Sequence, residues 1–120
     1  MKRIYTFGHE QVERNITIGD IVTNKKNNVK MTQVTAANHE EAEIIASQDI
    51  DMIITGSDWY EDVRKGAPNT FITAALFAGR FITHEEILRG AFDVMMAGAD
   101  SVLTPRSFEV VEMLAKEGIQ

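Results

Sequence analysis

From residue 31 to the end of the chain, short apolar runs alternate with stretches in which apolar residues recur at helical spacing. The short runs predict strands at residues 31–35, 52–55, 70–74 and 101–104. The middle two runs are almost unbroken, which is typical of strands buried on both faces. The pattern therefore favours a parallel sheet whose strands are joined by helices.

Helical periodicity predicts helices at residues 38–48, from residue 83 to about residue 97, and at residues 107–117. The last of these carries Val111 and Leu114 on its apolar face. Gly98 and Gly118 follow the second and third helices and are typical of helix ends.

Two of these helices begin alike, with NHEE from Asn38 and THEE from Thr83, so each can form a capping box with its second glutamate. The segments that lead into two strands also resemble one another, as IDMI from Ile50 and ADSV from Ala99. Such repetition indicates successive β/α units.

The first thirty residues follow a different pattern. Thr17 and Asp20 predict the start of a short helix over residues 17–22, and the polar segment 23–28 predicts a loop. With two prolines in the chain and no stretch typical of a linker, we expect one domain over residues 1–120. Residues 1–30 would form its N-terminal extension and residues 31–120 its β/α units.

Composition narrows the class of protein. The 120 residues are 44% apolar, enough for one modest core but fewer than the roughly 250 of a complete (β/α)8 barrel. Without cysteine, neither disulfides nor a cysteine-ligated zinc site can form, and the net charge of -6 disfavours nucleic-acid binding. No apolar run approaches a membrane span or a signal peptide, so we expect a cytoplasmic chain without a membrane partner.

In parallel α/β folds, ligands bind beyond the carboxyl ends of the strands. There, Gly56 permits close approach of a ligand, Ser57 offers a hydroxyl, and Asp58 offers a carboxylate. An anion can bind the free amides, or a divalent cation can bind Asp58. The alternative is an ordinary turn in which Asp58 caps a helix over residues 59–65.

Arg106 and Ser107 follow the last strand, where a guanidinium and a helix N-terminus can converge on one anion. The alternative is a solvated arginine paired with Glu109 or Asp58. Trp59 and Tyr60 either form the floor of a small pocket or cover the edge of the core.

Several motifs resemble the ketopantoate hydroxymethyltransferase (3-methyl-2-oxobutanoate hydroxymethyltransferase) family of the phosphoenolpyruvate/pyruvate barrel superfamily. They are VTAAN at residues 34–38, IDMIITGSD at 50–58, KGAPN at 65–69 and AGADSV at 97–102. The resemblance runs from about residue 16 to the end. It implies an α/β fold of parallel β/α units that form about half of a TIM (β/α)8 barrel.

The family chemistry implied by this resemblance is a magnesium-dependent transfer of a one-carbon unit from methylenetetrahydrofolate to a 2-oxo acid. The family's metal-binding aspartates align with Ser57 and Ala75, and its lysine and glutamate align with Leu103 and Pro105. The family's long segment after the second strand is contracted to residues 59–65. The resemblance thus implies a relative with altered or lost chemistry.

Two functions are consistent with these features. The first is one-carbon transfer or related C–C bond chemistry on a small 2-oxo acid or similar anion, bound by Gly56, Ser57, Asp58, Arg106 and Ser107, with Mg²⁺ at Asp58. The second is a non-catalytic half-barrel that assembles as a homo-oligomer or with a partner chain, because an open parallel sheet leaves two unpaired edges. The residues do not identify a catalytic group.

Overall fold

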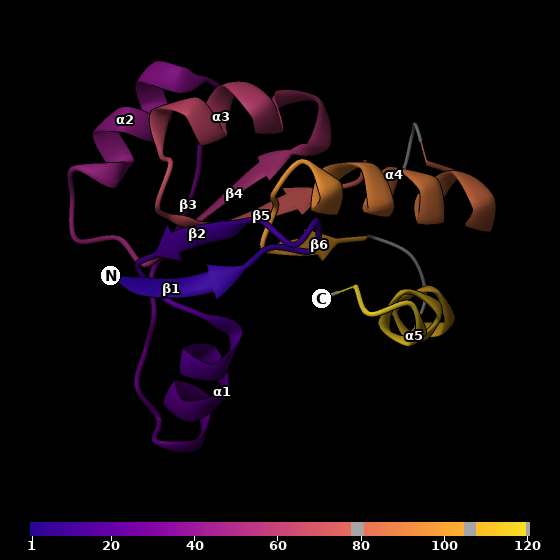
Figure 1. Cartoon of the computed structure of the whole chain (residues 1–120), viewed down its shortest axis with the longest axis horizontal. Helices are drawn as coiled ribbons and strands as arrows, with labels where there is room; N and C mark the ends of the chain where they lie inside the picture. The colour runs from indigo at the N-terminus through magenta and orange to yellow at the C-terminus, as the bar shows by residue number, and fades with distance from the viewer. Residues whose placement is uncertain (78–80, 105–107, 120) are drawn as a thin grey trace.

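The computed structural model describes residues 1–77, 81–104 and 108–119. A four-stranded parallel sheet has the order β3, β4, β5 and β6, formed by Gln33–Thr35, Met52–Gly56, Phe71–Ala75 and Ser101–Leu103 (Figure 1). The predicted parallel sheet is confirmed. The described strands form an open sheet with β3 and β6 at its edges.

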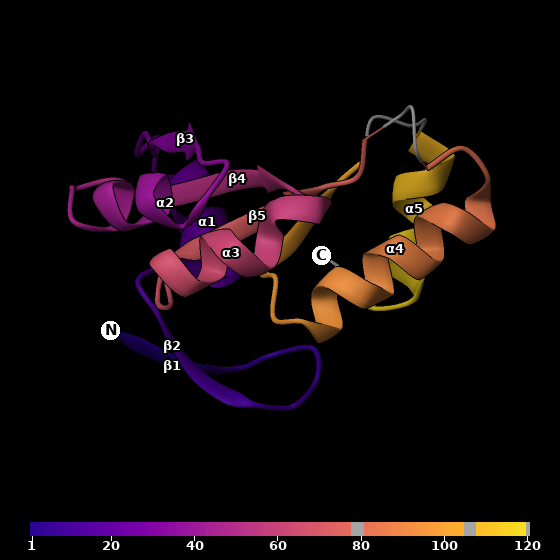
Figure 2. The ribbon, with the colours of Figure 1, turned by 90° about the horizontal axis from the view of Figure 1, so that it is seen from above.

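Helices connect and follow these strands: α2 at His39–Ala46, α3 at Tyr60–Gly66, α4 at His84–Met96 and α5 at Phe108–Lys116. A 3-10 turn, η1 at Ser57–Trp59, leads into α3. Figure 2 shows α2 and α3 side by side over the sheet, with α4 and α5 farther along it. The predicted helices at residues 38–48, 83–97 and 107–117 are confirmed to within a few residues.

One hydrophobic core lies between the sheet and its helices. Ile53 and Ile72 pair across β4 and β5 and are buried against Ala42 of α2, Val63 of α3 and Ala91 of α4. Because side chains alternate along a strand, Ile54 and Thr73 lie on the opposite face of the sheet.

The final helix contributes to the core with a different face from the one predicted. Val110 and Leu114 are buried, whereas Val111 is exposed. The expectation that Val111 belongs to the apolar core face is wrong, because Val110 faces the core in its place.

The capping predictions are largely confirmed. Thr83 and Glu86 form a reciprocal capping box. At α2 the Asn38 side chain accepts from the Glu41 amide at 2.9 Å, but the Glu41 carboxylate accepts from the Ala37 amide at 3.1 Å. The predicted return bond to Asn38 is therefore wrong, because the glutamate reaches one residue farther back.

The N-terminal helix is longer than its pattern predicts. Thr17 and Asp20 form the capping box of α1, which spans Ile18–Lys26. The loop predicted over residues 23–28 is thus wrong for residues 23–26, where Lys25 and Lys26 lie in the last helical turn and complement the helix dipole. None of the residues of α1, all of which the structure describes, is buried, and α1 lies across the sheet from α2 and α3 (Figures 1 and 2).

An antiparallel hairpin of β1 (Lys2–Tyr5) and β2 (Gln11–Arg14) precedes α1 and was not predicted. Arg14 is only 2% exposed, and its Nε donates to both Asp100 carboxylate oxygens at 2.8 and 3.0 Å. Arg64 Nη2 of α3 donates to the same carboxylate at 2.9 Å, as does the Ile72 amide of β5 at 2.9 Å. This buried cluster attaches the hairpin to the amino end of the sheet.

Asp51 and Asp100, from the two similar segments, have matching structural roles. Asp51 accepts from the Thr32 amide before β3 at 2.9 Å, as Asp100 accepts from the amide of Ile72. Asn15 adds a bridge, since its side chain donates to the Asp51 carbonyl at 2.8 Å and accepts from the Phe71 amide at 2.9 Å. The amino ends of the strands are therefore joined by side-chain hydrogen bonds. None of the described helices is long and apolar enough to span a membrane.

Candidate functional site

The carboxyl ends of three strands meet in one row. Gly56 of β4 pairs with Ala75 of β5, and Ala75 pairs with Leu103 of β6. By strand alternation this row lies on the face of the sheet opposite α2, α3 and α4. The two positions where the family resemblance implies metal-binding carboxylates, Ser57 and Ala75, therefore lie at neighbouring strand ends.

The space beside Gly56 is filled by an aromatic ring of the same chain. A Cβ at Gly56 would lie 2.5 Å from Phe77 Cε2 and 2.7 Å from Phe77 Cζ. The Phe77 ring meets the Trp59 ring edge-on, with centroids 5.9 Å apart, and both side chains are exposed. A side chain at position 56 would have to displace the Phe77 ring, so this aromatic pair lies where the sequence predicted a ligand.

Two hydroxyls near this strand end are buried and unpaired. Thr55 is 1% exposed, and neither its Oγ1 nor Ser57 Oγ has a hydrogen-bond partner among the described residues. A buried polar atom without a partner costs about 1–3 kcal/mol relative to a paired one. Buried polar atoms in proteins usually have a partner, which can be an ordered water or an ion.

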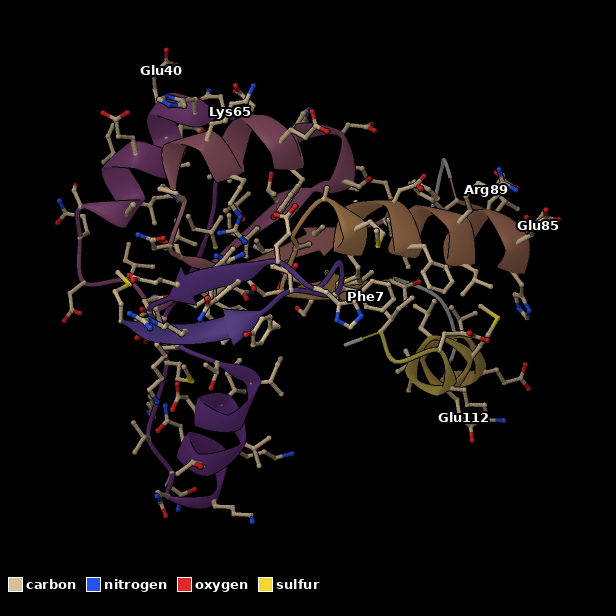
Figure 3. The ribbon with its side chains drawn as sticks, viewed as in Figure 1. Phe7, Glu40, Lys65, Glu85, Arg89 and Glu112 are labelled. Carbon is tan, nitrogen blue, oxygen red and sulfur yellow. The ribbon has the colours of Figure 1, made fainter. Side chains whose placement is uncertain are left out.

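A cavity of about 390 Å³ opens between η1 and α4. Its lining includes Ser57, Asp58, Phe81, Glu86, Arg89, Gly90, Asp93 and Val94. The three carboxylates outnumber the one guanidinium, and Arg89 also lies 3.8 Å from Glu85. Figure 3 shows Arg89 on α4, projecting away from α5. An anion entering this cavity therefore needs further positive charge.

Asp58 does not cap the helix that follows it. The residue before α3 is Trp59, and neither η1 nor α3 has a side-chain cap. The alternative in which Asp58 caps a helix is wrong, because the chain enters α3 through the 3-10 turn. Asp58 is exposed and lines the cavity instead.

The two aromatic residues after Asp58 separate. Trp59 packs on Phe77, whereas Tyr60 is buried in the core and accepts a hydrogen bond from Arg64 Nε at 2.8 Å. Burial raises the pKa of the Tyr60 hydroxyl, and the nearby Arg64 guanidinium partly offsets the rise. The prediction that both aromatics form the floor of one pocket is wrong, since Tyr60 lies inside the helix layer.

The structure brings Gly56, Ser57 and Asp58 together at the end of β4. Arg106 and Ser107 lie outside the described residues, as does Pro105. Within residues 1–77, 81–104 and 108–119, no group of three or more histidine or acidic side chains is arranged to hold a metal ion.

Sequence reasoning missed Phe77, which decides what occupies the space beside Gly56. Its only local signal is an aromatic residue shortly after a strand end. Nothing in that signal identifies Gly56, on another strand, as the residue that the ring contacts.

No family model matches the chain. The chain is 27% identical over 117 residues to a 3-methyl-2-oxobutanoate hydroxymethyltransferase of Kosmotoga olearia. The alignment covers 79% of this chain and 44% of that enzyme, so the chain spans less than half of the length of its relative. The similarity supports a distant relationship to these enzymes.

Proposed function

We propose that the chain is a distant half-barrel relative of the 3-methyl-2-oxobutanoate hydroxymethyltransferases that binds a small 2-oxo acid or a similar anion. The observation that carries the proposal is the strand end at Gly56–Ser57, where the buried Ser57 hydroxyl has no partner among the described residues. Carboxyl ends of parallel strands are where α/β folds bind their ligands.

Gly56, Ser57, Asp58, Arg106 and Ser107 are the proposed binding residues. Ser57 would donate its hydroxyl to a ligand oxygen, and Arg106 would provide the positive charge that the acidic cavity needs. Binding at this strand end also requires the Phe77 ring to move from its contact with Gly56.

Magnesium fits this site only in part. Asp58 offers one carboxylate, while the positions aligned with the family's two aspartates are Ser57 and Ala75. Mg²⁺ is usually bound through one or two carboxylates plus water. We therefore propose weak Mg²⁺ binding at Asp58 and derive no reaction step through the metal.

The proposed chemistry is one-carbon transfer or related C–C bond chemistry in altered form. Turnover of the family type would use methylenetetrahydrofolate as co-substrate. Because Ser57, Ala75 and Leu103 replace ionisable residues of the family, we expect ligand binding without the usual rate of hydroxymethyl transfer.

A thermal-shift titration with 3-methyl-2-oxobutanoate, with and without Mg²⁺, tests the site. Ligand at about 100 times its Kd stabilises a protein by about 2.7 kcal/mol, so the melting temperature should rise by several degrees. Ser57→Ala and Arg106→Gln should reduce the shift, whereas Asp93→Asn, which changes a cavity residue outside the proposed set, should not. If neither the oxo acid nor Mg²⁺ changes the melting temperature, the site proposal is wrong.

The open sheet favours a second candidate function, a non-catalytic half-barrel that assembles. All three residues of the edge strand β3 are exposed, and Leu103 of the other edge strand is exposed as well. This candidate predicts self-association without ligand.

A further inference from the structure

The space beside Gly56 accepts a planar aromatic ring. A Cβ placed on Gly56 would lie 2.5 Å from Phe77 Cε2 and 3.4 Å from Trp59 Cε3, so the glycine backbone forms a floor beneath both rings. The two ring centroids are 5.9 Å apart at an interplanar angle of 66°, an edge-on arrangement that aromatic pairs favour. The phenyl ring of Phe77 thus shows which kind of group fits this space.

The Phe77 ring does not belong to the hydrophobic core. Phe77 is 44% exposed and Trp59 is 43% exposed, whereas Leu76 is 1% exposed. The backbone around Phe77 is held in place, because the Leu76 amide donates to the Leu103 carbonyl at 2.9 Å and the Phe81 amide donates to the Phe77 carbonyl at 3.0 Å. Exposed side chains change rotamer rapidly, so rotation of the Phe77 side chain can vacate the space without moving the backbone.

The strand ends next to Gly56 extend this apolar surface. Ala75 pairs with Gly56, and Leu103, which is 48% exposed, pairs with Ala75. No residue of this row is charged, although the family resemblance implies ionisable residues at the positions of Ala75 and Leu103. An uncharged row favours the apolar part of a ligand, because covering it leaves no buried charge without a partner.

We propose that Gly56 and Trp59 form a subsite for the planar aromatic ring of a small acid, and that Phe77 occupies this subsite when no ligand is bound. The ring of the ligand would replace the Phe77 ring on Gly56 and meet the edge of Trp59. The carboxylate of the ligand would reach the adjacent Ser57, and this part alone rests on the proposed function. The preferred ligand is therefore a 2-oxo acid with an aryl side chain.

Occupation by Phe77 implies competition with the ligand. The apparent affinity of a ligand is reduced to the extent that the Phe77 ring fills the subsite, so Phe77→Ala should tighten binding severalfold. Adding Gly56→Ala places a methyl group on the floor of the subsite and should weaken the binding of an aromatic ring again. Gly19→Ala added to Phe77→Ala is the matched control, since its Cβ would meet nothing closer than 3.6 Å.

Benzyl alcohol, an aromatic probe without a carboxylate, tests the subsite by itself. Trp59 is the only tryptophan in the sequence, so one indole N–H signal in the nuclear magnetic resonance spectrum of the ¹⁵N-labelled chain reports binding. The probe should bind Phe77→Ala about tenfold more tightly than Phe77→Ala/Gly56→Ala, and the Gly19→Ala control should bind as Phe77→Ala does. Equal affinities of Phe77→Ala and Phe77→Ala/Gly56→Ala, or an indole signal that the probe does not shift, overturn the proposal. Circular dichroism checks that each variant is folded.

Phenylpyruvate and pyruvate, which share the 2-oxo acid group, test the ligand class on the natural chain. Calorimetric titration should show phenylpyruvate binding about tenfold more tightly than pyruvate. Equal affinities for the two acids overturn the aromatic subsite and leave the proposed function intact. Binding of benzyl alcohol to Phe77→Ala without binding of either acid to the natural chain supports the subsite and contradicts the proposed function.

Discussion

The two ends of the parallel sheet differ in how their polar groups are satisfied. At the amino end, Asp100 accepts from Arg14, Arg64 and the Ile72 amide, and Asn15 bridges Asp51, just before β4, to Phe71 of β5. At the carboxyl end, Thr55 and Ser57 keep buried hydroxyls with no partner in the described part of the chain. Buried ion pairs and hydrogen bonds therefore hold the amino end together, whereas the carboxyl end keeps two buried hydroxyls without a partner among the described residues.

The largest predicted effect comes from breaking the amino end. Asp100→Ala would leave the buried Arg14 guanidinium and the Arg64 guanidinium without their counter-charge, which should destabilise the fold by about 3–5 kcal/mol. Urea unfolding measures this loss. Asp93→Asn, at an exposed position, should change stability by less than about 0.5 kcal/mol. A loss below about 1 kcal/mol at Asp100 would contradict the assigned role.

The next largest predicted effect is the loss of stability when a side chain is added at Gly56, where Phe77 occupies the space. Gly56→Ala would force a Cβ into the Phe77 ring and should cost about 1–3 kcal/mol in unfolding free energy. Adding Phe77→Ala should remove most of that cost, because the contacted atoms belong to a side chain. Gly19→Ala is the control, since its Cβ would meet nothing closer than 3.6 Å and alanine favours helix. Equal costs of Gly56→Ala with and without Phe77 would contradict this explanation.

Restoring carboxylates tests what the carboxyl end lacks. The double variant Ser57→Asp/Ala75→Asp should bind Mg²⁺ at least tenfold more tightly than the natural chain, a gain of about 1.4 kcal/mol. Calorimetric titration measures the affinity. The neutral variant Ser57→Asn/Ala75→Asn should show no gain, and equal affinities of the two variants would exclude a metal site between these strands.

A smaller predicted effect is that of pH on the unfolding free energy, through the buried hydroxyl of Tyr60. Because burial raises the pKa of Tyr60, its contribution to stability is present below the ordinary tyrosine pKa of about 10 and is lost as pH rises through the folded-state value. Unfolding free energy should therefore fall above about pH 10 in the natural chain. The fall should be weaker in Tyr60→Phe, and identical pH profiles would contradict the prediction.

Local patterns predicted most of the fold. The strands around Ile53 and Ile72 and the helix after Thr83 follow from periodicity and capping, which depend on neighbouring residues. The hairpin was not predicted because Arg14 faces inward. A buried arginine can be explained only by its partner, here Asp100, which is 86 positions away in the sequence.

The candidate site shows the same limit. The sequence predicted that Gly56, Ser57 and Asp58 follow directly after a buried strand, and the structure places them at the end of β4. Their binding role stays a prediction. The sequence did not predict that Phe77 packs on Gly56 or that Tyr60 turns into the core, because both depend on contacts between different elements.

The link between Arg14 and Asp100 has a consequence for folding order. A contact that joins residues 86 positions apart must wait until the chain between them is compact, and during synthesis it must wait until Asp100 emerges from the ribosome. The hairpin is made first, yet its buried Arg14 can find its carboxylate only after Asp100 has been made. The beginning of this chain is therefore expected to be among the last parts to become fixed in place.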